Sequence, residues 1–278
     1  MKRVFLLAHP AGHSISPPMH NAAFKASGIT AHYEALDVAP EDLAKVIESF
    51  READVFGSNV TIPHKLAVMP LMDELTDAAR AIGAVNTIVN QDGKLLGHNT
   101  DATGYLRAIK EDAAFDLEGK TVVMLGAGGA ARAIVYALLN AGVHELKIFN
   151  RTTAKAQSLA DELMHLGQVT VSQDLTRDVA RANLLINTTS VGMEHNGIDP
   201  DESPLPDGIL PQQGFVSDIV YRPAKTRLLK EAETAGLRTQ NGLAMLIYQG
   251  AESFEYWTHQ KPEVRVMFAA AKQALGLT

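Results

Sequence analysis

A glycine-rich turn is the part of this sequence whose residue types point most directly to chemistry. The turn Gly126–Ala131 (GAGGAA) follows the apolar run Thr121–Leu125 and precedes an amphipathic helical segment. Gly126 and Gly128 allow a tight turn and a close approach of a ligand to the backbone, and the small Ala130 lets the helix pack near the strand. The first N–H groups of that helix then face an anion. This order of strand, turn and helix predicts a pyrophosphate site in a dinucleotide-binding fold.

The loop after the next expected strand, 145–149, distinguishes between two dinucleotides. An NAD site carries an acidic residue there, about 20 residues after the glycines, for the ribose 2′-hydroxyl. This chain instead carries the sequence NRTTAK at 150–155. Arg151 and Lys155 suit a 2′-phosphate. The predicted cofactor is therefore NADP.

Polar clusters in the first hundred residues follow expected strands, where α/β folds present their ligand sites. They are HSISP at 13–17, NVTIPHK at 59–65, GAVNT at 83–87 and GHNTD at 97–101. Hydride transfer between an alcohol and a nicotinamide needs a group that takes the alcohol proton and returns it. Lys65, at an expected helix start after Pro63, and Asp101, which opens another expected helix, are candidates for this proton transfer.

The composition agrees with a globular enzyme. The chain has 278 residues, of which 46% are hydrophobic and 21% charged, enough for two domains with cores of their own. Its net charge of −7 argues against nucleic-acid binding. The absence of cysteine excludes disulfides, cysteine-ligated zinc and thiol catalysis. The apolar run at the start ends at His9-Pro10 and is too short for a signal sequence or a membrane span, so a cytoplasmic protein is expected.

Hydrophobic periodicity predicts two α/β regions followed by two helices. In the first region, strands are expected at 4–8, 33–38, 55–60 and 85–89, helices at 18–27, 41–52, 65–72 and 73–82, and a hairpin turn at Asp92-Gly93. In the second, strands are expected at 121–125, 145–149, 169–171, 184–187, 215–220 and 238–240, helices at 130–140, 153–166 and 225–235, and a loop at 194–214.

The last segment carries an apolar stripe from Leu243 to Trp257 and a final helix expected to start near Pro262. Because such a tail cannot bury its stripe alone, we expect it to pack back on the first domain and to leave a cleft between two domains. The predicted organisation is a substrate-binding and catalytic domain at 1–103, a Rossmann-type NADP-binding domain at 104–241, and helices at 242–278 that complete the substrate domain.

Taken together, the motifs resemble those of the shikimate dehydrogenase family over nearly the whole length. HSISPPMHNAAF, NVTIPHK, GAVNT and GHNTD match its substrate domain; GAGGAARA, NRT and NTTSVGM match its cofactor domain. DIVYRPAKTRLL and GLAMLIYQGAESFEYW match its closing segment. The resemblance implies reversible NADP-dependent reduction of 3-dehydroshikimate to shikimate, in aromatic amino-acid biosynthesis by way of chorismate.

The resemblance also implies roles for individual residues. Lys65 is the acid/base and Asp101 its partner. The other substrate contacts are Ser14 and Ser16 on the carboxylate, Thr61 and Asn86 on ring hydroxyls, and Tyr221 and Gln249 on the far side of the pocket. The cofactor contacts are Gly126, Ala127, Gly128, Gly129 and Ala130 on the pyrophosphate, Asn150, Arg151, Thr152 and Lys155 on the 2′-phosphate, and Thr188, Ser190, Ile219 and Gly242 near the nicotinamide and its ribose.

Several alternatives stay open at the level of sequence. A neighbouring carboxylate raises a lysine pKa, whereas burial and a helix N-terminus lower it, so Lys65 is either a proton shuttle or a fixed cation. Ser16 is otherwise a helix cap, and Asn59 a residue that shapes its turn. A broader quinate/shikimate dehydrogenase and a non-catalytic sensor of shikimate-like ligands are the competing functions. A methylenetetrahydrofolate dehydrogenase would not explain the serine pair or the motif at 59–65.

Partners other than small molecules are not expected. His9, His13 and His20 lie in one region, but their spacing matches no common metal-ligand motif, so no metal site is predicted. Neither nucleic acid nor membrane is an expected partner. Monomer and homodimer are both compatible with the sequence.

Overall fold

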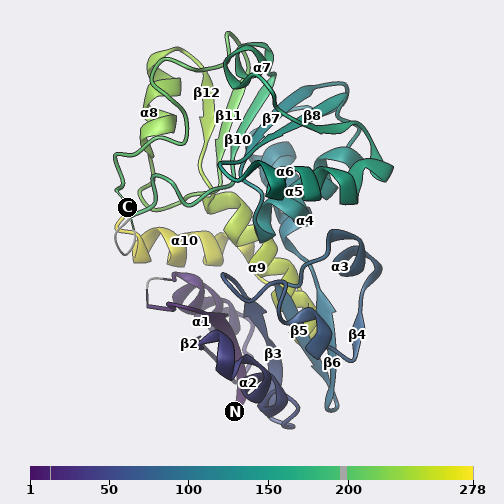
Figure 1. Cartoon of the computed structure of the whole chain (residues 1–278). Coiled ribbons are helices and arrows are strands. Elements are labelled where there is room, and N and C mark those ends of the chain that lie inside the picture. The colour runs from purple at the N-terminus through teal and green to yellow at the C-terminus, as the bar shows by residue number, and fades with distance from the viewer. Residues whose placement is uncertain (13, 195–198, 278) are drawn as a thin grey trace. The chain divides into compact units, whose positions relative to one another are not determined.

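The structure of the chain is a computed structural model, which describes residues 1–12, 14–194 and 199–277 (Figure 1). Contacts between Cα atoms divide the chain into two compact units. Unit 1 comprises Met1–Gly104 and Leu246–Thr278, and unit 2 comprises Tyr105–Met245. The divisions fall inside two helices, α4 (Asp101–Arg107) and α9 (Leu243–Thr258). His13, the first residue of the HSISP cluster, and residues 195–198 of the expected loop lie outside the described residues.

Unit 1 contains a mixed six-stranded sheet in the order β2-β1-β3-β5-β6-β4. Its strands are β1 (Lys2–Ala8), β2 (Ala31–Asp37), β3 (Val55–Val60), β4 (Glu74–Leu75), β5 (Thr87–Gln91) and β6 (Lys94–His98). β1 is parallel to β2 and β3, whereas β5 is antiparallel to β3 and β6. The β5–β6 hairpin turns at Asp92-Gly93, as predicted, and both turn residues have positive φ.

Apart from α1, the helices in the N-terminal part of unit 1 are short. They are α1 (Ser16–Ala26), the 3₁₀ turn Pro40–Asp42, α2 (Leu43–Ser49), the 3₁₀ turn Met69–Leu71, α3 (Asp77–Ile82) and the start of α4. The predicted helix at 65–72 is wrong: residues 62–68 form turns that end in the 3₁₀ turn. Pro70 has no N–H to donate and disfavours helix in the residue before it, so the helical spacing there does not give a helix.

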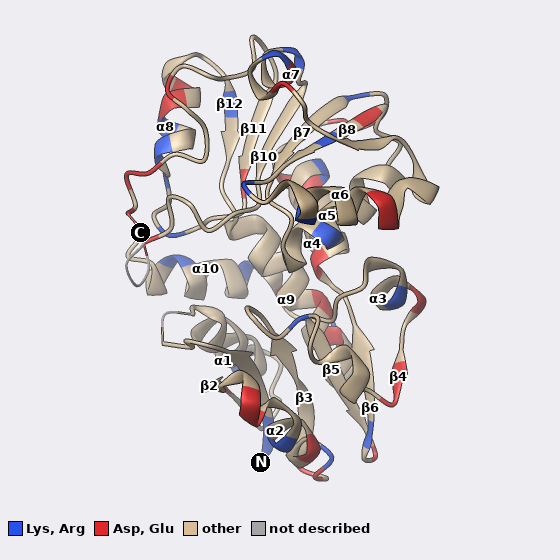
Figure 2. Ribbon diagram, in the orientation of Figure 1, with Lys and Arg blue, Asp and Glu red and all other residues tan. Residues whose placement is uncertain are grey.

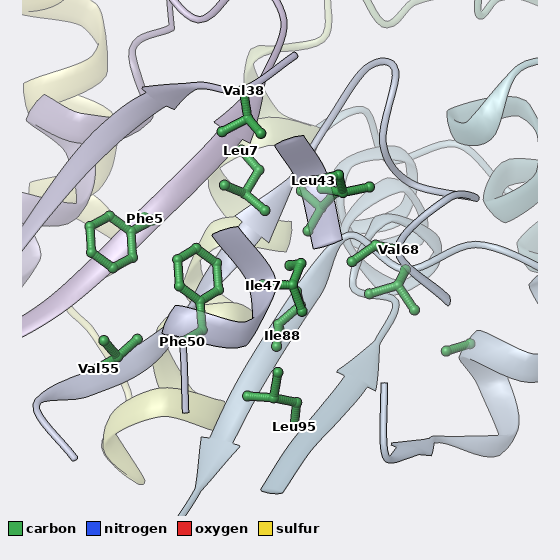
Figure 3. Packing of buried hydrophobic residues seen from close by; sticks show 13 residues of the cluster. Phe5, Leu7, Val38, Leu43, Ile47, Phe50, Val55, Val68, Ile88 and Leu95 are labelled. Carbon is green, nitrogen blue, oxygen red and sulfur yellow. The ribbon is translucent and has the colours of Figure 1, made fainter. Parts of the chain in front are cut away.

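The core beneath this sheet is made by the apolar faces of β1, β3, β5 and β6 and by α2. Phe5 and Phe50 stack with ring centroids 5.0 Å apart, and Ile47 and Ile88 fill the centre of the cluster (Figure 3). These side chains are at most 4% exposed. Burial of a large apolar side chain stabilises the fold by about 1.5–3 kcal/mol, so this cluster holds rigid the strands whose ends carry the polar motifs.

The C-terminal helices belong to unit 1, in line with the expected packing of the tail. α10 (Val264–Ala274) contacts α1. Phe254 of α9 packs on Phe24 of α1, with ring centroids 4.9 Å apart. The Trp257 indole donates a hydrogen bond of 2.9 Å to the carbonyl of Ile88 on β5. α9 thereby lies along the sheet of unit 1 and brings its polar side chains to the strand ends.

Unit 2 contains a fully parallel six-stranded sheet in the order β12-β11-β10-β7-β8-β9. Its strands are β7 (Thr121–Leu125), β8 (Glu145–Phe149), β9 (Val169–Val171), β10 (Leu184–Asn187), β11 (Phe215–Asp218) and β12 (Arg238–Gln240). β7 and β10 are neighbours although two strands separate them in sequence. This is the Rossmann order, in which ligands bind where the order reverses, outside the carboxyl ends of β7 and β10.

The helices of unit 2 connect these strands. They are the end of α4, the π-helical turn Ala108–Asp112, α5 (Gly129–Asn140), α6 (Thr153–Leu163) with the 3₁₀ turn Met164–Leu166, α7 (Leu175–Arg181), α8 (Arg227–Thr234) and the start of α9. α7 is missing from the sequence prediction although Asp174 caps it, accepting a hydrogen bond of 3.0 Å from the Arg177 N–H. Its seven residues are too few to display a helical period.

Charged residues pair locally on the surface. On α8, where Figure 2 shows both signs of charge, Arg227 binds Glu231 at 2.7 Å. Arg227 also binds Asp207 at 2.6 Å. Within the part of the chain that the structure describes, no helix combines the length and the apolar character that crossing a membrane requires.

Candidate active site

A buried ion pair lies at the carboxyl end of the sheet of unit 1. Lys65 Nζ is 2.5 Å from Asp101 Oδ2, and the two side chains are 12% and 6% exposed. Lys65 sits in the turns after β3, and Asp101 is the first residue of α4. The Asp101 N–H bonds the side chain of Asn99 at 3.1 Å, which fixes the start of the helix. A buried lysine and carboxylate in contact form a pair that can hold and move one proton.

Asn86, just before β5, holds the second oxygen of that carboxylate. Its amide nitrogen donates to Asp101 Oδ1 at 2.8 Å and to Thr100 Oγ1 at 2.9 Å. Its amide oxygen accepts from the Thr100 N–H at 2.8 Å and from the Thr87 hydroxyl at 3.0 Å. With both ends satisfied, the amide has one orientation, and that orientation points a donor at Asp101.

Gln249 of α9 joins this cluster from the C-terminal segment. Its side-chain oxygen lies 3.3 Å from Asn86 Nδ2, and its amide nitrogen donates to the Leu246 carbonyl at 2.9 Å. Gly104 makes this approach possible, because a Cβ there would lie 2.7 Å from the backbone nitrogen of Gln249. The structure thus brings together four residues predicted at the substrate site: Lys65, Asp101, Asn86 and Gln249.

The two predicted carboxylate-binding serines lie at the N-terminus of α1. Ser16 is its first residue rather than part of an extended segment, and its hydroxyl contacts the phenol of Tyr33. Ser14 lies just outside the helix, where its Oγ accepts a hydrogen bond of 3.2 Å from the Ser16 N–H. The N-cap position of α1 is Ile15, whose side chain makes no cap hydrogen bond, so the interpretation of Ser16 as a helix cap is wrong. Ser14 is partly exposed, whereas Ser16 is buried.

A buried polar chain links Ser16 to the ion pair. The Tyr33 phenol donates to Asn59 Oδ1 at 2.9 Å. Asn59 Nδ2 lies 3.2 Å from Thr87 Oγ1 and 3.0 Å from Ser253 Oγ. Asn59 thus lies in β3 and links the strands, so its interpretation as a turn-shaping residue is wrong. Tyr33 gave no signal in the sequence, whereas Asn59, Thr87, Thr100 and Ser253 lie inside recognised motifs.

Two buried titratable groups near this cluster carry no charge at neutral pH. Burial lowers the pKa of His98 to about 4, and its ring packs against that of Tyr256 at a tilt of 37°, with centroids 4.1 Å apart. His98 is therefore neutral at neutral pH. Burial raises the pKa of the Tyr33 phenol, so it also stays neutral. Thr61, which follows β3, is anchored by a bond of 2.9 Å from its N–H to the Leu7 carbonyl, and its predicted contact with substrate stays a prediction.

In unit 2, the glycine-rich turn joins β7 to α5 as predicted. Gly126 has φ of +110°, and a Cβ there would lie 2.5 Å from Thr188 Oγ1. Gly128 caps α5, and a Cβ there would meet no atom within 4 Å. The backbone at Gly128 is therefore open to a ligand, and the N–H groups at the start of the twelve-residue helix α5 can face a phosphate. These features fit a dinucleotide pyrophosphate.

The basic loop lies beside this turn, because the Gly126 N–H donates to the Phe149 carbonyl at the end of β8. Asn150 bonds the carbonyl of Thr152 at 2.9 Å, which closes the loop before α6. Arg151 and Lys155 are exposed, and neither forms an ion pair with any residue that the structure describes. Arg151 on the loop and Lys155 in the first turn of α6, neither in an ion pair with a described residue, fit a 2′-phosphate.

The remaining predicted cofactor contacts lie at the ends of β10, β11 and β12. Thr188 bonds the carbonyl of Leu125, through its N–H at 2.8 Å and its hydroxyl at 2.7 Å. Gly242 donates to the Val220 carbonyl, and a Cβ there would lie 1.9 Å from the Ile219 carbonyl oxygen. Ser190 is exposed. Tyr221 lies in unit 2 after β11, so its predicted place beside the substrate stays a prediction.

A buried carboxylate fastens these strand ends, although the sequence prediction gave it no role. Asp218 Oδ1 accepts from Asn187 Nδ2 at 3.0 Å and from the Val220 N–H at 2.9 Å, and its Oδ2 accepts from the Thr226 hydroxyl at 2.8 Å. Burial raises the pKa of Asp218 to about 6 in spite of these donors. No group of three or more His, Cys, Asp or Glu that could hold a metal ion occurs among the described residues.

Comparison with known proteins assigns this arrangement to a family. Three family models match: the shikimate dehydrogenase substrate binding domain at 6–88, shikimate/quinate 5-dehydrogenase at 108–196, and the shikimate 5′-dehydrogenase C-terminal domain at 242–272. The shikimate dehydrogenase (NADP(+)) of Symbiobacterium thermophilum is 47% identical over 97% of this chain and 93% of its own length.

Solved structures agree. Shikimate 5-dehydrogenase from Thermus thermophilus, in complex with NADP(H) and shikimate, is 41% identical with a TM-score of 0.89, covering 99% of this chain and all of that one. Quinate dehydrogenase from Corynebacterium glutamicum, in complex with NAD, is 32% identical with a TM-score of 0.87, covering 97% of this chain and 98% of that one. This chain belongs to the shikimate dehydrogenase family.

Proposed function

We propose that this protein catalyses the reversible NADP-dependent reduction of 3-dehydroshikimate to shikimate in aromatic amino-acid biosynthesis. The observation that carries the proposal is the buried Lys65–Asp101 pair at 2.5 Å, joined by Asn86 and Gln249. The same pairing is what an alcohol dehydrogenase needs to manage one proton beside the reacting oxygen. The name and bound ligands of the Thermus thermophilus relative support the same substrate and cofactor.

Lys65 is the proposed acid/base. In the direction of shikimate oxidation, the neutral amine of Lys65 takes the proton of the reacting hydroxyl and becomes an ammonium, and in reduction the ammonium returns that proton to the carbonyl oxygen. Asp101 orients the ammonium through Oδ2, and Asn86 keeps the carboxylate in place through Oδ1. When bound, the nicotinamide supplies the hydride in one direction and accepts it in the other.

Substrate recognition is assigned mainly to residues of unit 1. Ser14 and Ser16 bind the carboxylate at the start of α1, where the helix dipole favours an anion. Pro17 and Pro18 occupy the first turn and carry no N–H groups, so serine hydroxyls are the donors available there. The proposed contacts with the ring hydroxyls are Thr61, Lys65, Asn86 and Asp101, and Gln249 and Tyr221 are the further proposed substrate contacts.

Unit 2 is the proposed cofactor domain. Backbone N–H groups of Gly126 to Ala130 hold the pyrophosphate, and the loop Asn150–Thr152 with Lys155 holds the 2′-phosphate. Thr188, Ser190, Ile219 and Gly242 lie toward the nicotinamide and its ribose. Lysine binds phosphate as a point charge without the planar fork of arginine, so most of the preference for NADP comes from Arg151.

A broader quinate/shikimate dehydrogenase is the second candidate, because a quinate dehydrogenase is among the relatives with a similar fold. The experiment that separates the candidates measures reduced-cofactor formation by the purified protein with shikimate or quinate, each with NADP or NAD. We expect rapid turnover of shikimate with NADP, slow turnover of quinate, and loss of turnover in Lys65→Ala.

Each other outcome has a clear meaning. Comparable rates with quinate would favour the broader enzyme. Ligand binding without turnover in any combination would contradict a dehydrogenase and favour a sensor of shikimate-like ligands. Normal turnover by Lys65→Ala would mean that Lys65 is not the acid/base of the reaction.

A further inference from the structure

Ser253 of α9 lies at the centre of the buried polar cluster of unit 1. Its side chain is fully buried, and its Oγ is within hydrogen-bonding distance of four groups. These groups are Thr87 Oγ1 at 2.8 Å, Asn59 Nδ2 and the Gln249 carbonyl at 3.0 Å, and Thr100 Oγ1 at 3.2 Å. Ser253 therefore contacts three of the residues that surround Asn86.

Each hydroxyl group in this cluster has one hydrogen to donate, and this determines which group is the donor in each hydrogen bond. Thr87 has one hydroxyl hydrogen, and Asn86 Oδ1 at 3.0 Å is a pure acceptor, so Thr87 donates to it. The Thr87 oxygen is then left to accept. Ser253 Oγ, at 2.8 Å, is the nearest hydroxyl that can donate to it. The Gln249 carbonyl, one helical turn before Ser253 and 3.0 Å away, has a second lone pair and is the alternative acceptor. Two hydroxyl oxygens 2.8 Å apart need a hydrogen between them, however, and with the Thr87 hydrogen on Asn86 that hydrogen comes from Ser253.

We propose that Ser253 is a positioning residue for the Lys65–Asp101 pair. Its hydroxyl donates to Thr87, which keeps the Thr87 hydrogen on Asn86 Oδ1 and so keeps the Asn86 N–H on Asp101. The proposal rests on the proposed function for its kinetic consequence, and it does not place Ser253 in contact with substrate. Without Ser253, Thr87 is free to turn its hydrogen elsewhere, and Asn86 loses one of the two donors that fix its amide.

The chain offers a matched control in Ser58. Ser58 lies in β3 next to Asn59 and is fully buried like Ser253, and its hydroxyl has no hydrogen-bond partner among the residues that the structure describes. Ser58→Ala and Ser253→Ala thus remove the same atom from equally dry surroundings of one unit, and only the second change removes hydrogen bonds. Because alanine lacks only the hydroxyl oxygen of serine, both variants keep the same backbone and nearly the same side-chain volume.

Two measurements test the proposal together. The first is steady-state kinetics with shikimate and NADP, in which Ser253→Ala should lower kcat about three- to tenfold and change the shikimate KM less than about twofold. The second is hydrogen exchange of the Asn86 side-chain amide by NMR, which should become about tenfold faster. Ser58→Ala should match the wild type in both measurements.

A double variant shows whether Ser253 acts through Thr87. If it does, Thr87→Val and Thr87→Val/Ser253→Ala should have the same kcat, because the hydroxyl that Ser253 orients is already gone. Independent, multiplicative losses would overturn the proposal. So would faster exchange at Asn86 with unchanged kcat, which would give Ser253 a structural role only. If the wild type shows no shikimate turnover, the proposed function fails, while unchanged Asn86 exchange in Ser253→Ala would separately overturn the positioning role and faster exchange would support it.

Discussion

The candidate sites of the two units are made of different kinds of chemical groups. In unit 1, buried side chains bond other buried side chains: Lys65, Asp101, Asn86 and Gln249 form one network at distances of 2.5 to 3.3 Å. In unit 2, the candidate site combines backbone at strand ends, Gly126 and Gly242, where a Cβ would clash with its neighbours, and cations that carry no ion pair within the described residues. One site is organised before any ligand arrives, and the other offers open backbone and free charge.

This difference teaches where each kind of substitution acts. A buried network fails when one member changes, because the partner left behind is buried and unsatisfied. A backbone site tolerates most side-chain changes but not an added Cβ where the ligand or a neighbouring strand approaches. Exposed cations affect ligand choice and contribute little to the fold. The predictions below follow this order.

Asp101→Asn is expected to have the largest effect. It removes the charge that faces Lys65 and should lower kcat for shikimate about a thousandfold, measured by NADPH formation. Glu74→Gln is the matched control: it breaks the surface pair with Lys94, in which Glu74 and Lys94 are 58% and 51% exposed, and should change kcat less than about twofold. Similar kcat values for the two variants would contradict the contrast between a buried functional pair and a surface pair.

Adding a methyl group at each of two glycines should separate folding from cofactor binding. Gly126→Ala forces a positive φ and a contact with Thr188, so the free energy of unfolding should fall by about 1–3 kcal/mol. Gly128→Ala points into open space, so the protein should unfold within about 1 kcal/mol of wild type, while the KM for NADP rises about tenfold. Urea unfolding and kinetics measure both. A normal KM for NADP in Gly128→Ala would place the pyrophosphate elsewhere.

Arg151→Ala should change the choice of cofactor. Loss of its charge-assisted bonds to a 2′-phosphate should lower kcat/KM with NADP about tenfold and leave kcat/KM with NAD nearly unchanged. Lys155→Ala should show the same pattern at about threefold. Lys230→Ala, which removes an exposed cation from α8 of the same unit, should leave kcat/KM unchanged with both NADP and NAD. An equal loss with both cofactors would place Arg151 away from the 2′-phosphate.

The smallest expected effect concerns Asp218 and pH. Its folded-state pKa, raised to about 6, lies above the unfolded value of about 4, so the folded protein binds the extra proton in that interval. Stability from this group is therefore highest at low pH and falls as pH rises from about 4 to about 6. Relative to Asp218→Asn, the wild type should gain about 1 kcal/mol of unfolding free energy between pH 7 and pH 5.

Urea unfolding of both proteins at the two pH values measures this difference. His20 and His98, whose pKa values burial lowers to about 3 and about 4, affect both proteins alike and cancel in the comparison. A difference that does not change with pH would mean that Asp218 has an ordinary pKa.

Much of the fold was predictable because its signals are local. The expected strands at 55–60, 121–125, 145–149, 169–171, 184–187 and 238–240 coincide with strands of the structure, since each is a short run bounded by turn residues. The α/β fold class, the shikimate dehydrogenase family and its class of NADP-dependent oxidoreductases are confirmed by relatives that span nearly the whole chain. These predictions rested on sequence motifs, because each motif specifies both a local structure and the functional groups that it presents.

The remaining features depend on tertiary contacts that no local pattern encodes. Ser253 reads as one more polar residue on an amphipathic helix until α9 lies against β3 and β5. Tyr33 reads as a strand aromatic, yet its phenol connects Ser16 to Asn59. Asp218 reads as the end of a strand, and its burial follows only from the loops that fold over it. The prediction of a helix at 65–72 was wrong for a local reason, because the apolar residues have helical spacing but Pro70 is incompatible with a helix there.

The proposal that unit 1 carries the catalytic residues and unit 2 binds the cofactor is tested most directly by comparing wild type with Lys65→Ala. The comparison measures the affinity for NADPH and the rate of shikimate oxidation of both proteins. The account predicts that Lys65→Ala binds NADPH as the wild type does, with a Kd within about twofold, and loses at least about a hundredfold in kcat. A parallel loss of NADPH affinity, or retained kcat, would contradict it.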